Sequence, residues 1–171
     1  MTDLKSKEIR SEITSEGKLN LSIVTSDVPT PGDDDVLIKV EASPINPSDL
    51  GLLISFAADL DSISSQGSGE DTVTTMGIHP GLMQSMKPRI DKSMKVGNEG
   101  GGVIVDAGKN VKNLIGKTVG VAGGAMYSQY RCLPAISCLV MNEGTTSVEA
   151  ASSFVNPLTC LLYTSDAADE F

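Results

Sequence analysis

The 171-residue sequence contains no tryptophan, a single histidine (His79) and only three cysteines, which are Cys132, Cys138 and Cys160. A zinc site requires about four close-set Cys or His ligands, or three and a water molecule. The cysteines show no Cys-x-x-Cys spacing, and His79 lies in an Ile-His-Pro-Gly turn. We therefore interpret the thiols as buried or incidental, because free cysteine behaves mostly as a small hydrophobic residue.

Positive charge is also scarce, with 13 Lys and Arg against 22 Asp and Glu and a formal net charge of −9. Nucleic acids are bound by clustered Lys and Arg, and the sequence has no such cluster. It has no apolar run of about 18 residues, and its first ten residues lack the apolar region of a secretory signal. These absences predict an intracellular, cytoplasmic protein with neither a nucleic-acid nor a membrane partner.

Short strands separated by Gly, Pro and Asp turns dominate the pattern. Strands are expected at 8–14 and 19–26, joined as a hairpin, and at 36–42. Residues 110–121 are expected to form a turn, a hydrophobic pair and a strand, residues 126–133 an extended segment, and residues 137–141 a further short strand. A short helix should begin at Pro47, and another with Ser147 as its N-cap. Residues 56–95, rich in Ser, Gly, Thr and Met, predict an irregular lobe. The expected architecture is a mainly β chain with short helices, forming a barrel.

Glycines crowd into one stretch, Gly97–Gly108, which reads GNEGGGVIVDAG. Glycine weakens a strand, so such a cluster indicates a close approach to the backbone or a positive φ. A phosphate-cradling loop is disfavoured because a strand, rather than a helix, follows these glycines.

Four blocks together resemble one family over roughly residues 8–159. They are Val36–Asp49, Gly97–Gly108, Gly116–Tyr130 and Ala150–Thr159. These blocks are similar to the medium-chain dehydrogenase/reductase superfamily, in its zinc-independent quinone reductase and enoyl reductase-like branch. The resemblance implies a GroES-like β-barrel of the alcohol dehydrogenase N-terminal type. It also implies that a following Rossmann domain, which carries most of the cofactor site, is lacking here.

The resemblance also accounts for the shortage of metal ligands. Zinc-dependent members have Cys where this chain has Asn46 and His where it has Asn98. Asparagine amides are poor zinc ligands beside thiolate and imidazole. The expectation is an enzyme without zinc and with no metal-binding residues.

The implied reaction is hydride transfer from NAD(P)H to a quinone or to an alkene conjugated with a carbonyl. Asn46 and Tyr127 are the candidate catalytic hydrogen-bond donors to the substrate oxygen. Asp49 is expected to organise the substrate pocket, and Asn98 and Glu99 to line it. For Asn46, a turn or helix-cap role is the competing interpretation.

Cofactor contacts are expected at Asn156 and Thr159, near the nicotinamide. No Gly-x-Gly-x-x-Gly fingerprint follows a strand in this sequence. The segment 160–171 resembles the translation of a common sequencing adapter, so we expect residues 1–159 to be the native domain and the tail to be non-native. This predicts an inactive fragment, and for the full-length parent the resemblance implies a homodimer.

Enoyl reductases of this branch usually have a tyrosine about eight residues beyond the position of Asp49, where this chain has Ser55-Phe56-Ala57. A quinone or general enone substrate is therefore favoured over a fatty-acid enoyl substrate. Two alternatives remain open besides a fatty-acid enoyl reductase-like enzyme. They are a non-catalytic interaction or structural protein on the same fold, and a free-standing β-barrel binding module.

Overall fold

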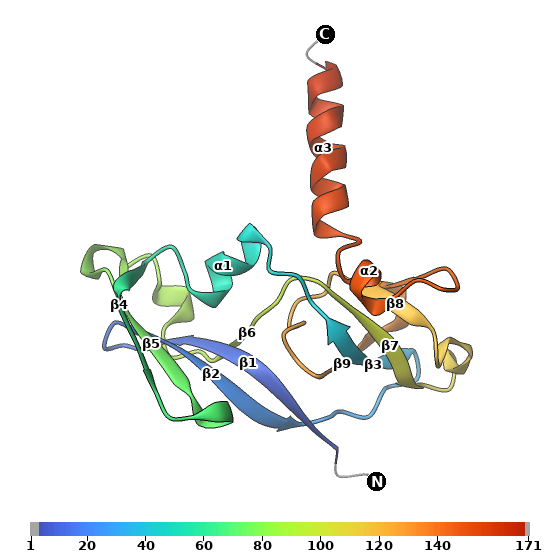
Figure 1. Cartoon of the computed structure of the whole chain (residues 1–171), viewed down its shortest axis with the longest axis horizontal. Coiled ribbons are helices and arrows are strands. Elements are labelled where there is room, and N and C mark those ends of the chain that lie inside the picture. The colour runs from blue at the N-terminus through green and yellow to red at the C-terminus, as the bar shows by residue number, and fades with distance from the viewer. Residues whose placement is uncertain (1–3, 170–171) are drawn as a thin grey trace. The chain divides into compact units, whose positions relative to one another are not determined.

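The computed structural model describes residues 4–169, which form two compact units. The first unit contains residues 4–27 and 45–96, and the second contains residues 28–44 and 97–169. Each unit is built on one five-stranded antiparallel sheet (Figure 1). The prediction of a mainly β chain with short helices is confirmed. None of the described helices is long and apolar enough to cross a membrane.

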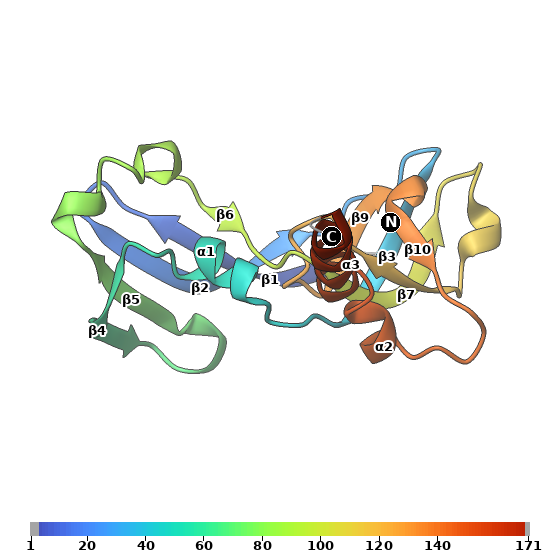
Figure 2. The ribbon, with the colours of Figure 1, turned by 90° about the horizontal axis from the view of Figure 1, so that it is seen from above.

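The sheet of the first unit has the strand order β4-β5-β2-β1-β6, which Figure 2 shows from above. Its strands are β1 (Lys5–Ile13), β2 (Lys18–Asp27), β4 (Ala58–Gln66), β5 (Val73–Ile78) and β6 (Met94–Lys95). β1 and β2 form the predicted hairpin, in register from Lys5 opposite Asp27 to Ile13 opposite Leu19. Alternation along this hairpin places Ile13 and Leu19 in the core of the unit.

Residues 56–95 are more regular than the sequence indicated. They contain β4 and β5 and three short 3₁₀ turns, at Gly69–Asp71, Pro80–Leu82 and Lys87–Arg89. β5 pairs with β2, and β4 pairs with β5 across an irregularity between Asp59 and Ser64. The expectation of an irregular lobe is therefore wrong for residues 58–78. Because β4 and β5 are rich in Ser and Thr, their sequences lack the alternation of apolar and polar residues from which strands are predicted.

The sheet of the second unit has the order β10-β8-β7-β3-β9. Its strands are β3 (Asp35–Ala42), β7 (Gly100–Ala107), β8 (Thr118–Val121), β9 (Tyr130–Pro134) and β10 (Cys138–Val140). One face of this sheet carries the unit's apolar core, which is composed of Val36, Ile38, Ile104, Ala107, Val119, Val121, Met126 and Leu133. The strand expected at 36–42 thus pairs with both β7 and β9, and its residues 36–38 are buried.

Close packing explains the glycine stretch. A Cβ on Gly101 would lie 2.3 Å from the carbonyl oxygen of Ser147, and one on Gly102 would lie 2.0 Å from that of Lys39. On the neighbouring strand β8, a Cβ on Gly120 would lie 2.6 Å from the carbonyl oxygen of Ala150. The expected close approach to the backbone is therefore made by helix α2 (Ser147–Ala151) and by strand β3.

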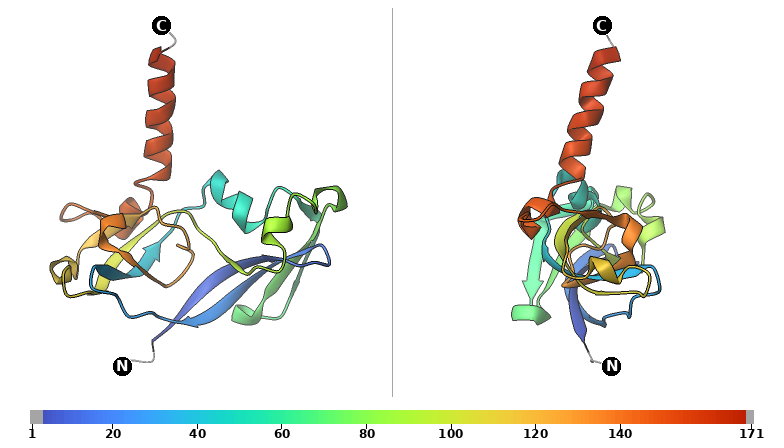
Figure 3. Two further views of the ribbon diagram at one scale, coloured as in Figure 1. Left: turned by 180° about the vertical axis from the view of Figure 1, so that it is seen from behind. Right: turned by 90° about the vertical axis from the view of Figure 1, so that its right-hand side faces the viewer.

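Helix α2 begins one residue earlier than the sequence analysis proposed. Thr146, not Ser147, is the N-cap, and it forms a capping box with Glu149. The helix ends at Ala151, and after a short break helix α3 (Val155–Asp169) begins. The segment 150–159, where the family resemblance implies the start of an interdomain helix, therefore spans the end of α2, a short break and the start of α3 (Figure 3).

Candidate functional site

The predicted site residues fall into two groups, one in each unit. Asn46 and Asp49 belong to the first unit, at the start of helix α1 (Pro47–Leu53). Tyr127, Asn98 and Glu99 belong to the second unit.

Asn46 and Asp49 form the amino-terminal end of α1. The backbone N–H of Asn46 donates to Asp49 Oδ2 at 2.8 Å, and the N–H of Asp49 donates to the Asn46 carbonyl at 2.9 Å. Both side chains are buried, with Asn46 3% and Asp49 1% exposed. Pro47 occupies the first turn, as predicted, because its missing N–H is not needed there. The structure therefore places Asn46 at a helix cap and makes Asp49 the residue that fixes its backbone.

Arg89 holds the other end of α1, a role that no pattern in the sequence predicts. Its guanidinium donates to the carbonyls of Gly51 at 3.1 Å and Leu52 at 2.7 Å, and to Ser11 Oγ at 3.2 Å. A cation at a helix carboxyl end offsets the negative end of the helix dipole. Burial lowers the pKa of this guanidinium from its ordinary value. Both ends of the helix that carries Asn46 are thus fixed by charged side chains.

Glu8 is a second buried carboxylate of this unit, with 5% of its side chain exposed. Arg10 forms an ion pair with Glu8 Oε1, and Lys95 Nζ lies 3.0 Å from Glu8 Oε2. Burial alone raises the pKa of the Glu8 carboxyl, but hydrogen bonds from Lys95 and Arg10 outweigh it and hold the pKa below its ordinary value. The group is therefore a structural ion pair that joins β1 to β6.

Tyr127 lies against Gly97, at the start of the glycine stretch, within the second unit. Its hydroxyl donates to the Pro44 carbonyl at 2.9 Å. Its ring and backbone lie so close to Gly97 that a Cβ on Gly97 would approach within 2.6 Å. Gly97 has a φ of 94°, so glycine is required there on both counts. The half-buried Tyr127 side chain is thus fixed between the end of the β3 segment and the start of the glycine stretch.

Two backbone hydrogen bonds join residues 97–98 to the loop that precedes Tyr127. The N–H of Gly124 donates to the Asn98 carbonyl at 3.2 Å, and the N–H of Met126 donates to the Gly97 carbonyl at 3.1 Å. Ser43 Oγ reinforces this loop by donating to the Met126 carbonyl at 2.9 Å. The structure therefore brings the half-buried Asn98 and Tyr127 onto adjoining segments.

Glu99 is almost completely buried, at 1% exposed. Its Oε2 accepts hydrogen bonds from the backbone N–H groups of Phe154, at 3.1 Å, and Val155, at 2.9 Å. These two N–H groups are at the start of α3. The predicted pocket residue thus reaches the segment that carries the predicted cofactor contacts.

Asn156 and Thr159 lie in the first turns of α3, and both are exposed. Thr159 Oγ1 donates to the Val155 carbonyl of its own helix at 2.7 Å. Because Glu99 already occupies the first N–H groups of this helix, they are not available to bind a phosphate.

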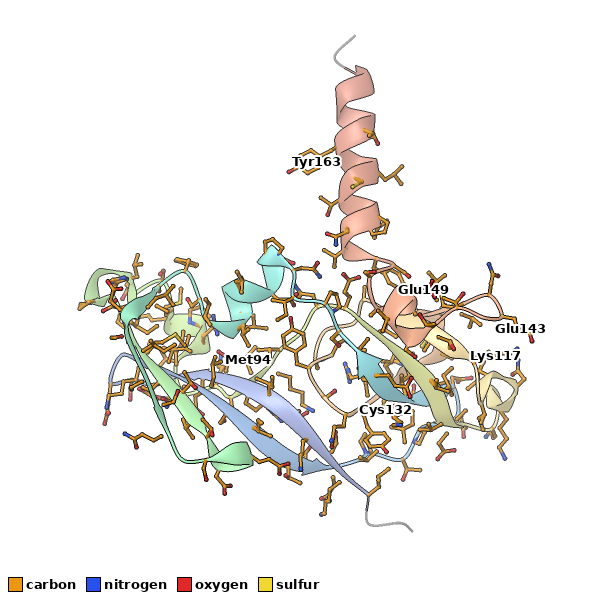
Figure 4. All side chains as sticks on the ribbon, viewed as in Figure 1. Met94, Lys117, Cys132, Glu143, Glu149 and Tyr163 are labelled. Atoms are coloured by element: carbon orange, nitrogen blue, oxygen red, sulfur yellow. The ribbon has the colours of Figure 1, made fainter. Side chains whose placement is uncertain are left out.

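Two of the cysteines, Cys132 and Cys138, lie on strands β9 and β10, and the third follows Thr159 on α3. Burial raises the pKa of the Cys138 thiol to about 11, and burial followed by the nearby Asp35 raises that of Cys132, which Figure 4 labels. Cys160 is exposed on α3. In the part of the chain that the structure describes, no group of three or more His, Cys, Asp and Glu side chains could hold a metal ion.

Three hollows in the two units lie away from the predicted site residues. A polar hollow of about 590 Å³ covers the outer face of β2, β4 and β5, and includes Asn20, Ser64 and Thr75. An apolar hollow of about 280 Å³ lies between Ile23 and Leu53. In the second unit, a hollow of about 320 Å³ adjoins the turn at 142–144. No predicted site residue lines any of these three.

Comparison with solved structures gives the class of fold. A candidate NADPH:quinone reductase from Mesorhizobium loti matches 99% of this chain with a TM-score of 0.64 and 23% identity, and the match covers 46% of that protein. A quinone oxidoreductase from Coxiella burnetii matches 96% of the chain with a TM-score of 0.62 and 20% identity, over 46% of its own length. The CurK enoyl reductase matches 90% with a TM-score of 0.59 and 16% identity, over 40% of its length.

The chain therefore has a fold that occurs in quinone oxidoreductases and enoyl reductases, and it spans less than half the length of these solved structures. No protein-family model and no curated protein matches the sequence. The fold agrees with the resemblance carried by the four sequence blocks.

Proposed function

We propose that this chain forms the substrate-side part of a zinc-independent oxidoreductase of the medium-chain dehydrogenase/reductase superfamily. The parent enzyme would use NAD(P)H to reduce quinones or carbonyl-conjugated alkenes. One combined observation carries the proposal. The fold occurs in quinone oxidoreductases and enoyl reductases, and asparagines stand at both positions, 46 and 98, where the resemblance places zinc ligands.

The roles of the residues follow from the chemistry of hydride transfer. When bound, the reduced nicotinamide supplies the hydride, and negative charge develops on the substrate oxygen. The Asn46 amide, in the first unit, and the Tyr127 hydroxyl, in the second, are the two separate candidates for a donor to that oxygen. Tyr127 donates to Pro44 in this structure, so its hydroxyl would have to rotate toward a substrate. Asp49 supports Asn46 through the N–H that its carboxylate accepts.

Asn98 and Glu99 are proposed to shape the substrate pocket, Asn98 at its surface and Glu99 from behind it. Asn156 and Thr159 are proposed to contact the nicotinamide end of the cofactor. Their exposure on the first turns of α3 supports this, because a cofactor could reach both side chains.

The first experiment mixes the 171-residue chain with NADPH and a benzoquinone and follows the loss of nicotinamide absorbance. We expect negligible turnover, because most cofactor contacts of the parent would lie beyond Thr159. Calorimetry that detected tight dinucleotide binding to this chain would contradict the proposal.

The second experiment uses the protein extended by its native continuation beyond Thr159. There, Asn46→Ala should lower kcat/KM for the quinone by about tenfold to a hundredfold, since a donor to a developing oxyanion is lost. The matched control is Asn113→Ala, an exposed asparagine of the second unit, which should leave kcat/KM unchanged. A folded extended protein without turnover on any quinone or enone would instead favour a non-catalytic role.

A further inference from the structure

We infer that Glu99 is the positioning residue that fixes the direction of the segment Phe154–Thr159. The inference rests on the proposed function only for what that segment contacts. Its basis is the pair of hydrogen bonds from the Phe154 and Val155 N–H groups to Glu99 Oε2.

Helix α3 has no capping side chain of its own. Phe154 precedes the helix and accepts its first backbone hydrogen bond, from the N–H of Leu158 at 3.0 Å, but a phenyl ring cannot accept from the next N–H groups. Helices α1 and α2, in contrast, are each closed by a local capping box, with Asp49 and Glu149 as the acids. The acceptor for α3 comes instead from a residue 55 positions earlier in the chain.

The part of α3 whose side chains the structure describes buries little apolar surface. Its apolar side chains from Leu158 to Tyr163 are exposed, including Leu161 at 65% and Tyr163 at 74%, and Figure 4 shows Tyr163 projecting from the helix. A helix of this length without a packed apolar face is marginal in water. Only a short break separates it from α2, where Ser153 Oγ donates back to the Glu149 carbonyl at 3.2 Å. The Glu99 carboxylate therefore links the start of α3 to the strand that follows Glu99.

Glu99 is itself firmly placed. It immediately precedes β7, whose glycines allow α2 to approach the strand closely, as the contact between Gly101 and Ser147 requires. A carboxylate that accepts two N–H groups at a helix start also benefits from the positive end of the helix dipole. The side chain thus transmits the position of the glycine strand to the segment that carries Asn156 and Thr159.

The test measures amide hydrogen exchange of the 171-residue chain. Glu99→Ala should speed exchange at Phe154 and Val155 by about tenfold or more, because the cap is lost. Glu99→Gln keeps the size of the side chain and one acceptor oxygen, so exchange at Phe154 and Val155 should stay close to the wild-type rate. This variant also keeps the test possible if Glu99→Ala does not fold. In both variants the amides of Val119 and Val121 in the core should keep their wild-type rates.

The matched control is Glu149→Gln, which alters the capping acid of α2 and should leave the Phe154 and Val155 rates unchanged. Uniformly faster exchange in Glu99→Gln, or no change at Phe154 and Val155 in a folded Glu99→Ala, would overturn the inference. In the extended protein, Glu99→Ala should raise KM for NADPH more than KM for the quinone, and Glu99→Gln should restore most of the wild-type KM for NADPH. If Glu99→Ala speeds exchange at Phe154 and Val155 but raises the two KM values equally, only the proposed cofactor role of the segment is refuted.

Discussion

The substitution Gly101→Ala tests the packing that organises the second unit. A Cβ at this position would lie 2.3 Å from the Ser147 carbonyl oxygen and 2.7 Å from the Ala151 nitrogen. Ordinary contacts between such atoms are about 3.5 Å, so α2 would have to move by about 1 Å. Both neighbours are backbone atoms, which cannot rotate away. Overpacking of this kind costs about 1–3 kcal/mol, and we expect a value near the upper end, about 3 kcal/mol.

The assay is urea denaturation followed by circular dichroism. With a slope of about 2 kcal/mol per M, a loss of about 3 kcal/mol lowers the midpoint by about 1.5 M. Gly123→Ala is the control in the same unit, because its Cβ would meet only a methyl group of Val121, at 3.3 Å. That variant should stay within about 0.5 kcal/mol of the wild type. An unchanged midpoint for Gly101→Ala would refute the close contact between α2 and β7.

Three further predictions concern charge and reactivity. Glu8→Gln should lower the free energy of unfolding by about 2 kcal/mol at pH 7. Because the pKa of Glu8 is lowered in the folded protein, the stability that its carboxylate contributes is present above the ordinary pKa of 4.5 and is lost as the pH falls through the folded pKa. Urea unfolding curves of the variant and the wild type should therefore converge in acid. Arg89→Met should destabilise the first unit by about 1–3 kcal/mol, measured by urea denaturation, since the last carbonyls of α1 lose their donors; equal stability would show that water replaces the guanidinium. At pH 8, iodoacetamide should modify Cys160 well before Cys138, because burial raises the pKa of the Cys138 thiol to about 11. Mass spectrometry of peptides measures this order, and faster modification of Cys138 would contradict the prediction.

Much of the fold could be predicted because its signals are local. The hairpin β1–β2, the strand β3 and the start of α1 at Pro47 all follow from alternation, turns and a proline at a helix start. β4 and β5 could not be predicted in the same way. Their Ser- and Thr-rich sequences are strands because they pair with β2, and pairing of that kind depends on tertiary contacts.

In the candidate site, too, the features that could be predicted are those that depend on neighbouring residues in the sequence. The helix-cap interpretation of Asn46 came from residues next to it, and the structure has that cap. The partners of Arg89 and Glu99 could not be predicted, because each side chain meets backbone groups 37 or more positions away. A lone arginine in an irregular-looking stretch carries no periodic signal, and a carboxylate beside glycines does not reveal which helix it will cap.

The irregularity in β4 has a consequence for how copies of this chain meet. β4 is an edge of its sheet, and Leu60 and Ile63 are 56% and 58% exposed, so an unbroken strand here would be a template for aggregation. The ladder with β5 is interrupted between Asp59 and Ser64, and within the interruption Ser62 Oγ accepts from the Gly77 N–H at 2.7 Å. The distorted backbone and the carboxylates of Asp59 and Asp61 leave an incoming strand only short stretches to pair with. The edge thereby protects the chain from intermolecular β-sheet growth.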